Sequence, residues 1–398
     1  MRRMTPPLCL LLVMAGGLAG PLAAQAVSQT AAPQAAAPPS PRWFEKIDLT
    51  GWLAGDGRWL RTGKGASAAT TTDLYLRAFE IGVEADLADW ASATVVLDSE
   101  WIGDALNGGD AGVVVDEAHL DIAVPRSPLY FVLGLRTQPF GLFETHFATD
   151  PLVQDAYETR AVGLTAGLKA PRSTDLSVTV YKGRVQAGHL YGSGLFDAAA
   201  APPPQAPVDR VGSWIVSGVS SPAGKAWTVF AAFASEPGAG RRMTAFNAGS
   251  NLAVPGLKSL QLDAEYARGL RREDAPGLGR SFRESAFSAT ASYQFVARKR
   301  AVLGGGNYRA RKSRRLAHPA ELALRFEAFD DGGRAAALAS WSVRERVSLG
   351  GRYTFFEQGG VLAALDLEVR RQTLRVAPGY DGPAGPGDEV TVRLGLDF

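Results

Sequence analysis

The sequence predicts an all-β fold: a transmembrane antiparallel up-and-down β-barrel of sixteen strands, with eighteen strands as the alternative. Three observations predict it. Apolar and polar residues alternate with a period of two, short connections alternate with long ones, and the last strand ends on Phe398. Both termini are expected on the periplasmic side, so the strand number must be even. The number of strands stays open because of the region between Asp330 and Val376. The candidate turns there, at Gly332–Gly333, Arg344–Glu345 and Gln358–Gly360, cannot all be turns in a barrel with an even number of strands.

The N-terminal 42 residues are predicted to lie outside the barrel. Arg2 and Arg3 precede an apolar run of residues 8–19, and small residues flank Gln25, as in a Sec signal peptide. The run is too short to span a bilayer comfortably. The Ala, Pro and Gln residues that follow cannot bury enough apolar area to offset their ordering entropy. The predicted division is a signal peptide (residues 1–26), a flexible linker (27–42) and an outer-membrane β-barrel (43–398).

Composition excludes several classes of function. The chain carries 42 Lys and Arg against 40 Asp and Glu, and loss of Arg2 and Arg3 with the signal leaves a formally neutral mature protein. Overall charge therefore gives no argument for nucleic-acid binding. The only cysteine, Cys9, lies in the predicted signal, which excludes disulfides, thiolate metal sites and cysteine nucleophiles from the mature chain.

The period of two is clearest at the C-terminus. Val390, Val392, Leu394, Leu396 and Phe398 share one strand face, and polar residues occupy the other. The same alternation recurs around Leu120–Val124, Leu129–Leu135, Phe287–Phe295, Leu322–Phe326 and Leu365–Val369. One apolar face per strand is typical of a barrel with lipid outside and water inside.

Connection lengths support the same fold. The short connections are Ala88–Asp89, Pro125–Ser127, Pro171–Ser173, Ser221–Gly224 and Val254–Gly256, and the long ones are Thr62–Thr72, Gly103–Gly112, Thr137–Thr159, Val185–Asp209 and Arg271–Ser281. This asymmetry is typical of outer-membrane barrels, which have short periplasmic turns and long external loops. A soluble β-sandwich or propeller is the alternative. The absence of a 40- to 50-residue repeat and the gathering of aromatic residues near strand ends count against it.

One segment resembles a known family. Pro139-Phe140-Gly141-Leu142-Phe143-Glu144, Thr149-Asp150-Pro151-Leu152 and Glu158-Thr159-Arg160-Ala161 follow Asp116-Glu117-Ala118 in the sequence. This order resembles the TonB-independent siderophore porins of the legiobactin-uptake type and, more broadly, the phosphate-selective porins O and P. The resemblance covers residues 116–167, and Thr149, Val153, Tyr157 and Val162 depart from the family pattern. It implies a sixteen-stranded outer-membrane porin and, more narrowly, uptake of a ferric siderophore.

The loop of residues 137–159 is the expected constriction. A barrel of this size leaves an aqueous lumen unless a loop folds inward. This loop carries residues for a sharp turn, large apolar groups for anchoring and acids that could face the passage. They are Pro139, Phe140, Gly141, Phe143, Glu144, Asp150, Pro151, Asp155 and Glu158. The alternative is another external loop, although an exposed loop has little use for large apolar groups.

Charged residues on polar strand faces are the expected selectivity elements. Arg309, Arg311 and Arg325 are predicted to form a basic face of the pore, and Glu117 and Asp121 an acidic one. Arginines opposite an acidic loop would produce a transverse field that selects solutes by charge. Structural ion pairing is the alternative, because charges in narrow lumens also pair with one another.

The sequence gives little support for catalysis. His119 lies between Glu117 and Asp121, but same-face neighbours on a strand are about 7 Å apart, too far to share one metal ion. No Ser/His/Asp order or paired-carboxylate spacing stands out, and a TonB-dependent receptor would need a plug domain that the linker cannot supply. We therefore expect no enzyme activity, metal or cofactor. A barrel enzyme and a structural or adhesive barrel remain the alternatives from other classes.

The predicted function is passive diffusion of small hydrophilic solutes, anions among them, across the bacterial outer membrane after Sec export. The alternative is substrate-specific siderophore uptake. The implied partners are outer-membrane lipid and lipopolysaccharide, further copies in a homotrimer, and the barrel-assembly machinery, which would recognise Phe398.

Overall fold

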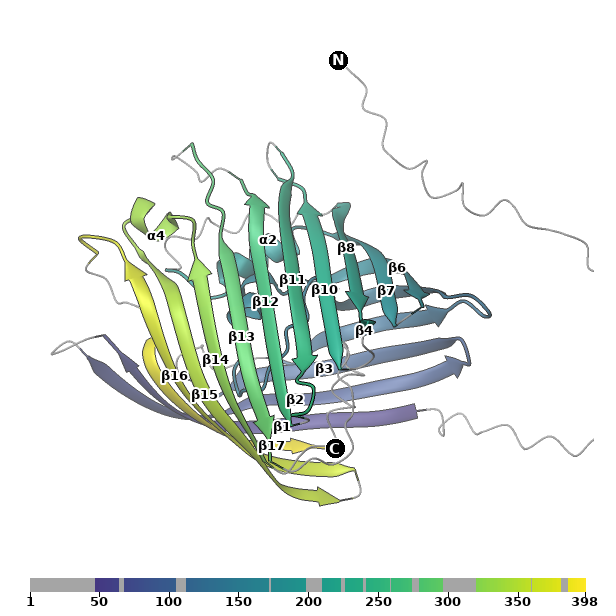
Figure 1. Ribbon diagram of the computed structural model, residues 1–398, viewed down its shortest axis with the longest axis horizontal. Coiled ribbons are helices and arrows are strands. Elements are labelled where there is room, and N and C mark those ends of the chain that lie inside the picture. The colour runs from purple at the N-terminus through teal and green to yellow at the C-terminus, as the bar shows by residue number, and fades with distance from the viewer. Residues whose placement is uncertain are drawn as a thin grey trace, which may run out of the picture. The chain divides into compact units, whose positions relative to one another are not determined.

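The computed structural model describes residues 47–63, 68–104, 112–171, 173–197, 210–222, 226–238, 241–257, 259–273, 279–295, 320–358, 360–380 and 386–398. Sixteen antiparallel strands form one closed barrel in this part of the chain, which confirms the predicted fold and the smaller strand number (Figure 1). The predicted signal peptide and linker lie outside the described residues.

The chain winds around the barrel in sequence order. Each strand pairs with the next one, and β1 pairs with β17 to close the ring. The strands are β1 (Ile47–Thr62), β2 (Ala69–Ala88), β3 (Ala91–Ile102), β4 (Val114–Ala123), β5 (Leu129–Thr137), β6 (Arg160–Ala170), β7 (Thr174–Lys182), β8 (Val211–Ser220), β10 (Trp227–Glu236), β11 (Met243–Ala253), β12 (Leu260–Arg271), β13 (Ser285–Gln294), β14 (Ala320–Asp330), β15 (Trp341–Gln358), β16 (Val361–Val376) and β17 (Pro386–Asp397). In the described connections there are three helices: α1 (Leu152–Tyr157), α2 (Val185–Gly192) and α4 (Arg334–Ala337). None of the described helices is both long and apolar enough to cross a membrane.

The alternation of side chains gives the barrel two different surfaces. On β14, Leu324 is 54% exposed on the outer surface, whereas Arg325 next to it is 0% exposed on the inner side. Outward-facing residues are apolar around much of the barrel, and inward-facing ones include many polar and charged groups. The period of two in the sequence therefore corresponds to the two faces of the wall.

The ambiguous region between Asp330 and Val376 contains one connection at each end of β15. Arg344 and Glu345, one of the three candidate turns that the sequence left open, lie inside β15 and are not a turn. The pairing with β16 shifts register between Val343 and Glu345, which marks a β-bulge. A bulge and a turn both interrupt alternation, which explains the ambiguity.

Arg309 and Arg311, which the sequence places on a strand of their own, follow β13 in the chain. β13 pairs directly with β14, from Ser285 opposite Asp330 to Gln294 opposite Glu321. Both arginines lie outside the described residues. Of the three expected members of the basic pore face, only Arg325 belongs to the described part of the chain.

Phe398 takes part in closing the barrel. Its backbone exchanges two hydrogen bonds with Gly51: the Gly51 N–H donates to the Phe398 carbonyl (2.7 Å), and the Phe398 N–H donates to the Gly51 carbonyl (3.0 Å). The ring lies against the Gly51 Cα, where an added Cβ would stand 2.2 Å from the nearest ring carbon. Gly51 therefore provides the space that the terminal ring occupies.

Candidate functional site

The connection between β5 and β6 folds into the barrel. Phe140, Leu152 and Tyr157 of this loop are fully buried. Its hydrogen-bond partners lie on β12, β14, β15 and β16, more than a hundred residues later in the chain. We call residues 138–159 the first inward loop. Its position agrees with the inward fold predicted from its apolar residues.

Three wall carboxylates hold the backbone of the first inward loop. Glu265 on β12 accepts hydrogen bonds from the N–H groups of Leu142 (3.1 Å) and Phe143 (2.9 Å). Glu368 on β16 accepts from the N–H and the hydroxyl of Thr149 (3.0 and 2.8 Å). Glu327 on β14 accepts from the N–H of Leu152 at the start of α1 (2.6 Å). Buried N–H groups need acceptors, and a loop without sheet partners finds them here in side chains.

His146 fixes the loop through two ion pairs. Its Nε2 lies 2.8 Å from Asp263 on β12, and its Nδ1 lies 2.5 Å from Glu321 on β14. Burial opposes the charged imidazolium, but the hydrogen bonds to these two carboxylates outweigh it and raise the pKa of His146 to about 10. The histidine is therefore a cation at neutral pH and crosslinks the loop to two strands.

We expect His146→Gln to lower the free energy of unfolding by about 2 kcal/mol near neutral pH, because two hydrogen bonds between charged groups are lost. A histidine with a raised folded pKa stabilises the fold fully below its unfolded pKa of 6.5, and this contribution disappears as the pH rises through about 10. Denaturant unfolding in detergent should therefore show a wild-type advantage that is largest below pH 6.5, shrinks as the pH rises towards 10 and is absent above pH 10. A difference that stays constant would contradict this assignment.

His189 supplies the matched control for that measurement. Its Nε2 lies 3.2 Å from the backbone carbonyl of Gln154, a neutral partner. His189→Gln should therefore lower stability less than His146→Gln at every pH below 10.

An aromatic contact and an ion pair complete the attachment of the first inward loop. The ring of Phe147 lies over Gly350 on β15, where an added Cβ would stand 2.6 Å from the ring, and the Arg325 guanidinium lies 4.4 Å from the ring centre. Arg346 on β15 contacts the Asp155 carboxylate at 3.1 Å. Burial raises the pKa of Asp155 to about 6, and the Arg346 charge opposes this rise.

The other residues predicted for this loop differ in their contacts and in their burial. Gly141 packs where a Cβ would meet the Phe143 ring at 2.2 Å, so the turn requires glycine. Glu158 accepts a hydrogen bond from the Thr137 hydroxyl (3.1 Å). Pro139, Glu144 and Asp150 are half-buried, and Pro151 is buried.

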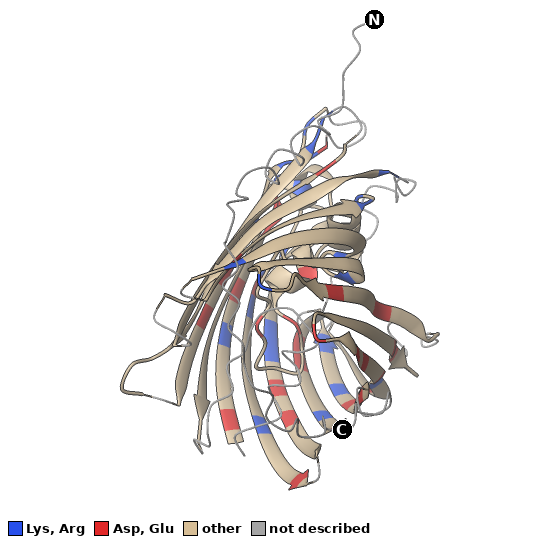
Figure 2. Cartoon of the chain, turned by 90° about the vertical axis from the view of Figure 1, so that its right-hand side faces the viewer, with Lys and Arg blue, Asp and Glu red and all other residues tan. Residues whose placement is uncertain are grey.

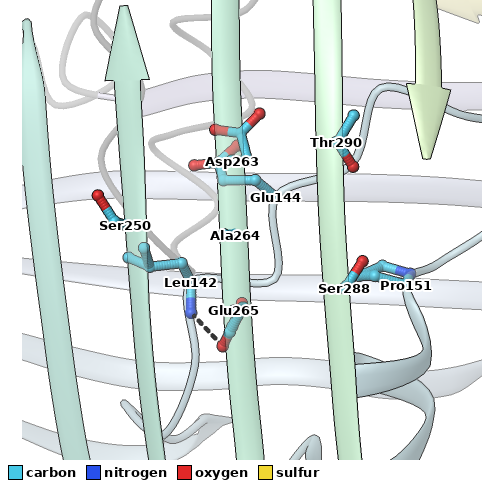
Figure 3. Close-up of a pocket in the computed structure, with 9 residues that line it drawn as sticks. All are labelled: Leu142, Glu144, Pro151, Ser250, Asp263, Ala264, Glu265, Ser288 and Thr290. Atoms are coloured by element: carbon cyan, nitrogen blue, oxygen red, sulfur yellow. Dashed lines mark hydrogen bonds between the residues drawn. The ribbon is translucent and has the colours of Figure 1, made fainter. Parts of the chain in front are cut away.

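A small cavity lies between the first inward loop and the wall. Its volume is about 20 Å³, and Leu142, Glu144, Pro151, Ser250, Asp263, Ala264, Glu265, Ser288 and Thr290 line it (Figure 3). This is room for one water molecule. Solutes therefore do not pass between the loop and β11–β13 at this point.

The connection between β7 and β8 also enters the barrel, although the sequence suggested an external loop. The Val343 N–H donates to the Leu195 carbonyl (2.8 Å), and the Asp197 N–H donates to the Trp341 carbonyl (3.1 Å), so this segment pairs with β15 across the barrel. Glu236 on β10 accepts from the N–H of Gln186 (2.9 Å) at the start of α2. We call residues 183–197 the second inward loop.

The two inward loops form one apolar core inside the barrel. Phe140, Leu152 and Tyr157 of the first loop cluster with Leu190 and Phe196 of the second. Strands β6 to β15 contribute residues to this cluster, whereas the described residues of β1–β5 and β17 contribute none. The described part of this apolar core therefore lies against β6–β15.

Arg325 does not line an open lumen, which corrects the sequence-based prediction. It is fully buried beneath the first inward loop, 3.1 Å from Glu327 and 3.6 Å from Glu368. It also donates to the carbonyl and the hydroxyl of Thr149 (3.0 and 2.9 Å). Structural ion pairing, the alternative weighed for this residue, describes its surroundings.

Glu117 and Asp121 lie on β4. His119 stands between them, with its Nε2 3.4 Å from Glu117 and its Nδ1 3.0 Å from Asp121. The three side chains therefore form an ion-paired row. Among the described residues, no group of three or more His, Cys, Asp or Glu side chains is arranged to hold a metal ion.

Comparison with known proteins supports the fold. No family model matches the sequence, and a search of curated proteins finds no significant match. Solved structures do match: the outer membrane channel DcaP of Acinetobacter baumannii is 11% identical, with a TM-score of 0.56 over 88% of this chain and 97% of that one. OmpF of Salmonella typhi is 12% identical (TM-score 0.57; 88% and 97%), and an anion-selective porin from Comamonas acidovorans is 10% identical (TM-score 0.53; 88% and 98%). The chain therefore has the sixteen-stranded fold of these porins.

Proposed function

We propose that this protein is an outer-membrane porin that allows passive diffusion of small hydrophilic solutes. One observation carries the proposal: a closed barrel with an apolar outside and a charged inside holds two inward loops whose described apolar core lies against β6–β15. A barrel of sixteen strands is too wide for its own side chains to fill, so we expect an aqueous path beside the two loops. Two structures of the same fold are described as a channel and a porin, which adds support by analogy.

The outer membrane is the compartment that this surface fits. Exposed Leu, Val and Phe side chains around the barrel would aggregate in water and are suited to lipid. A closed barrel satisfies all backbone hydrogen bonds within its wall, as a spanning structure must. Sec export, contacts with lipopolysaccharide and assembly as a homotrimer stay predictions from the sequence.

Uptake of a ferric siderophore and a preference for anions are not part of this proposal. The two inward loops occupy space that a bulky chelate would need. The expected arginine face retains only Arg325 among the described residues, and that side chain is buried. The anion selectivity named for the Comamonas porin stays with that protein, given 10% identity.

The test is single-channel recording of the refolded protein in planar lipid bilayers with KCl. We expect stepwise, ohmic conductance increments that stop when the barrel is heat-denatured before addition. Folded, heat-modifiable barrels that insert without conducting would overturn the proposal and would favour a structural or adhesive barrel.

A further inference from the structure

Four arginines stand on the outer face of the barrel, at the end where the two inward loops begin. They are Arg242, Arg268, Arg271 and Arg283, and all four are exposed. This is the upper end in Figure 1, where β10 and β12 end, and Figure 2 shows basic residues in blue at this end as well as along the wall. We call these four residues the outer arginine cluster.

The strand register places the cluster on the outer face. Ala267 belongs to the apolar core inside the barrel, so the next side chain, Arg268, points outward. Arg271 pairs with the residue two positions after Arg242, and Arg268 pairs with the residue two positions after Arg283. Paired residues share a face, as do residues two apart on one strand, and the spacings are about 5 and about 7 Å. The four Cα atoms therefore lie within roughly 15 Å of one another.

Aromatic side chains border the cluster on the membrane side. Phe246 stands directly opposite Arg268, and the ring centre of Tyr266, two residues earlier on β12, lies 5.7 Å from that of Phe246. Phe233 on β10 and Phe287 on β13 continue this aromatic row, opposite Phe246 and Tyr266. Rows of this kind mark the interface between the apolar lipid and the headgroups on a membrane barrel. The cluster begins at this level, where lipid phosphates are found.

The acids of the same strands face the other way. Between residues 211 and 294, the acids in the described part of the chain all contact partners inside the barrel, and they are Glu236, Asp263, Glu265, Glu273 and Glu284. Within the described residues, Arg268, Arg271 and Arg283 have no hydrogen bond or ion pair. The outer face of this sector therefore carries positive charge that no described acid neutralises.

Arg242 is held in place by uncharged acceptors. Its Nε donates to the Ser235 hydroxyl (2.7 Å), and one terminal nitrogen donates to the carbonyls of Gly212 (2.7 Å) and Ser235 (2.9 Å). These bonds fix the side chain against β8 and β10 without neutralising its charge. The other terminal nitrogen takes no part in these bonds and is available to an acceptor from outside.

Two exposed arginines elsewhere at the same end of the barrel do have acidic partners. Arg344 on β15 contacts Glu345 (3.3 Å), and Arg371 on β16 contacts Asp388 (3.7 Å). Exposure alone therefore does not explain why the cluster lacks such partners. Arginines without acids beside an aromatic row are suited to an anion that the membrane supplies.

We propose that the outer arginine cluster binds the phosphate groups of an outer-leaflet lipid whose headgroup carries two phosphates, as the lipid A part of lipopolysaccharide does. This inference rests on the outer-membrane location in the proposed function and assigns one lipid contact to particular residues. A guanidinium binds phosphate through two parallel hydrogen bonds. Four such groups spread over roughly 15 Å suit two phosphates better than one. The acyl chains of the same lipid would lie against the aromatic row.

The experiment measures binding of lipid A to the refolded protein in detergent micelles by native mass spectrometry. The reference ligand is the same lipid after removal of both phosphates. The wild type should bind the phosphorylated lipid at least about tenfold more tightly, equivalent to about 1.4 kcal/mol. Equal affinities for the two lipids would overturn the proposal, and this comparison needs no variant.

A double variant tests whether the cluster itself is responsible. Arg268→Gln with Arg271→Gln should weaken lipid A binding at least about tenfold, because two charge-assisted contacts are lost. The matched control, Arg344→Gln with Arg371→Gln, removes two exposed, ion-paired arginines from the same end and should stay within about twofold of the wild type. Equal losses in the two double variants would assign the attraction to net charge and would overturn the proposed site.

Pyrophosphate separates a lipid ligand from a free anion. At equal concentration it should not displace lipid A, because the free anion has no acyl chains to pack against the aromatic row. Displacement would assign the cluster to a soluble phosphate compound and would overturn the lipid assignment.

Conductance keeps this proposal apart from the porin function. Arg268 and Arg271 lie on the outer face, so their double variant should keep wild-type single-channel conductance. Failure of the lipid A measurements with channels that conduct would overturn the lipid site alone. Folded wild-type protein that binds lipid A without conducting would support the lipid site and overturn the porin function.

Discussion

Excision of residues 143–155 should raise single-channel conductance by about twofold or more, because the first inward loop fills space that a sixteen-stranded barrel would otherwise leave to water. The excised segment holds the His146 ion pairs, the Phe147 contact with Gly350 and most of α1. Its loss also removes Leu152 from the apolar core, which loosens the second inward loop. Conductance recorded in planar bilayers, with barrel folding checked by heat modifiability, measures the effect. An intact deletion variant with wild-type conductance would show that the passage does not depend on this loop.

A single substitution in the barrel wall tests whether the first inward loop narrows the passage, without changing the sequence of the loop. Gly350→Val would place a Cβ 2.6 Å from the Phe147 ring and should displace the first inward loop from its contact with β15. Gly351→Val is the control, since a Cβ at that neighbouring position meets its nearest atom at 3.4 Å, an ordinary contact. We expect increased or noisier conductance from Gly350→Val and wild-type conductance from Gly351→Val. Equal behaviour of the two variants would contradict the proposed seat.

Deletion of Phe398 should abolish most of the assembled barrel, because it removes the two backbone hydrogen bonds and the ring that join the chain end to β1. The apolar face that ends at this residue is also the expected signal for the assembly machinery. The measurement is the fraction of heat-modifiable protein in the outer membrane of an expressing cell. Normal levels of folded barrel after the deletion would refute both roles.

A substitution on β1 can separate the role of the Phe398 ring in closing the barrel from the role of Phe398 as an assembly signal. Gly51→Val would displace the Phe398 ring while leaving the C-terminal residue unchanged. Gly57→Val is the control, because a Cβ there meets nothing closer than the Val392 carbonyl at 4.0 Å. We expect a reduced folded fraction for Gly51→Val alone. Full assembly of Gly51→Val, together with failure of the Phe398 deletion, would assign the effect to recognition rather than to closure.

The strands of the barrel wall could be predicted from the sequence because the pattern that defines them involves only neighbouring residues. Leu322, Leu324 and Phe326 alternate with polar residues in direct succession, and lipid on one side of a strand is sufficient to explain that pattern. The bulge at Arg344–Glu345 could not be told from a turn because its signature depends on the partner strand β16, which lies outside any short window of sequence.

The interior was harder to predict because its contacts join distant segments. In the sequence, Glu265 cannot be distinguished from other lumen-facing acids. The loop N–H groups that donate hydrogen bonds to it belong to residues more than a hundred positions earlier in the chain. The second inward loop did carry a signal: Leu190, Leu195 and Phe196 are large apolar groups in a supposedly exposed connection, the same observation that identified the first loop. Arg325 faces inward as predicted, but only the folded loop could reveal that it is covered.

The distant anchors of the first inward loop also set an order of events during biogenesis. Thr149 contacts Arg325, 176 residues later in the chain, and Glu368, 219 residues later. Contacts of such sequence separation form late, since the intervening chain must first be organised. The loop therefore cannot dock until β14 and β16 have joined the ring. A newly closed barrel would pass through a leaky stage, with its lumen wide open, before the loop reaches its seat.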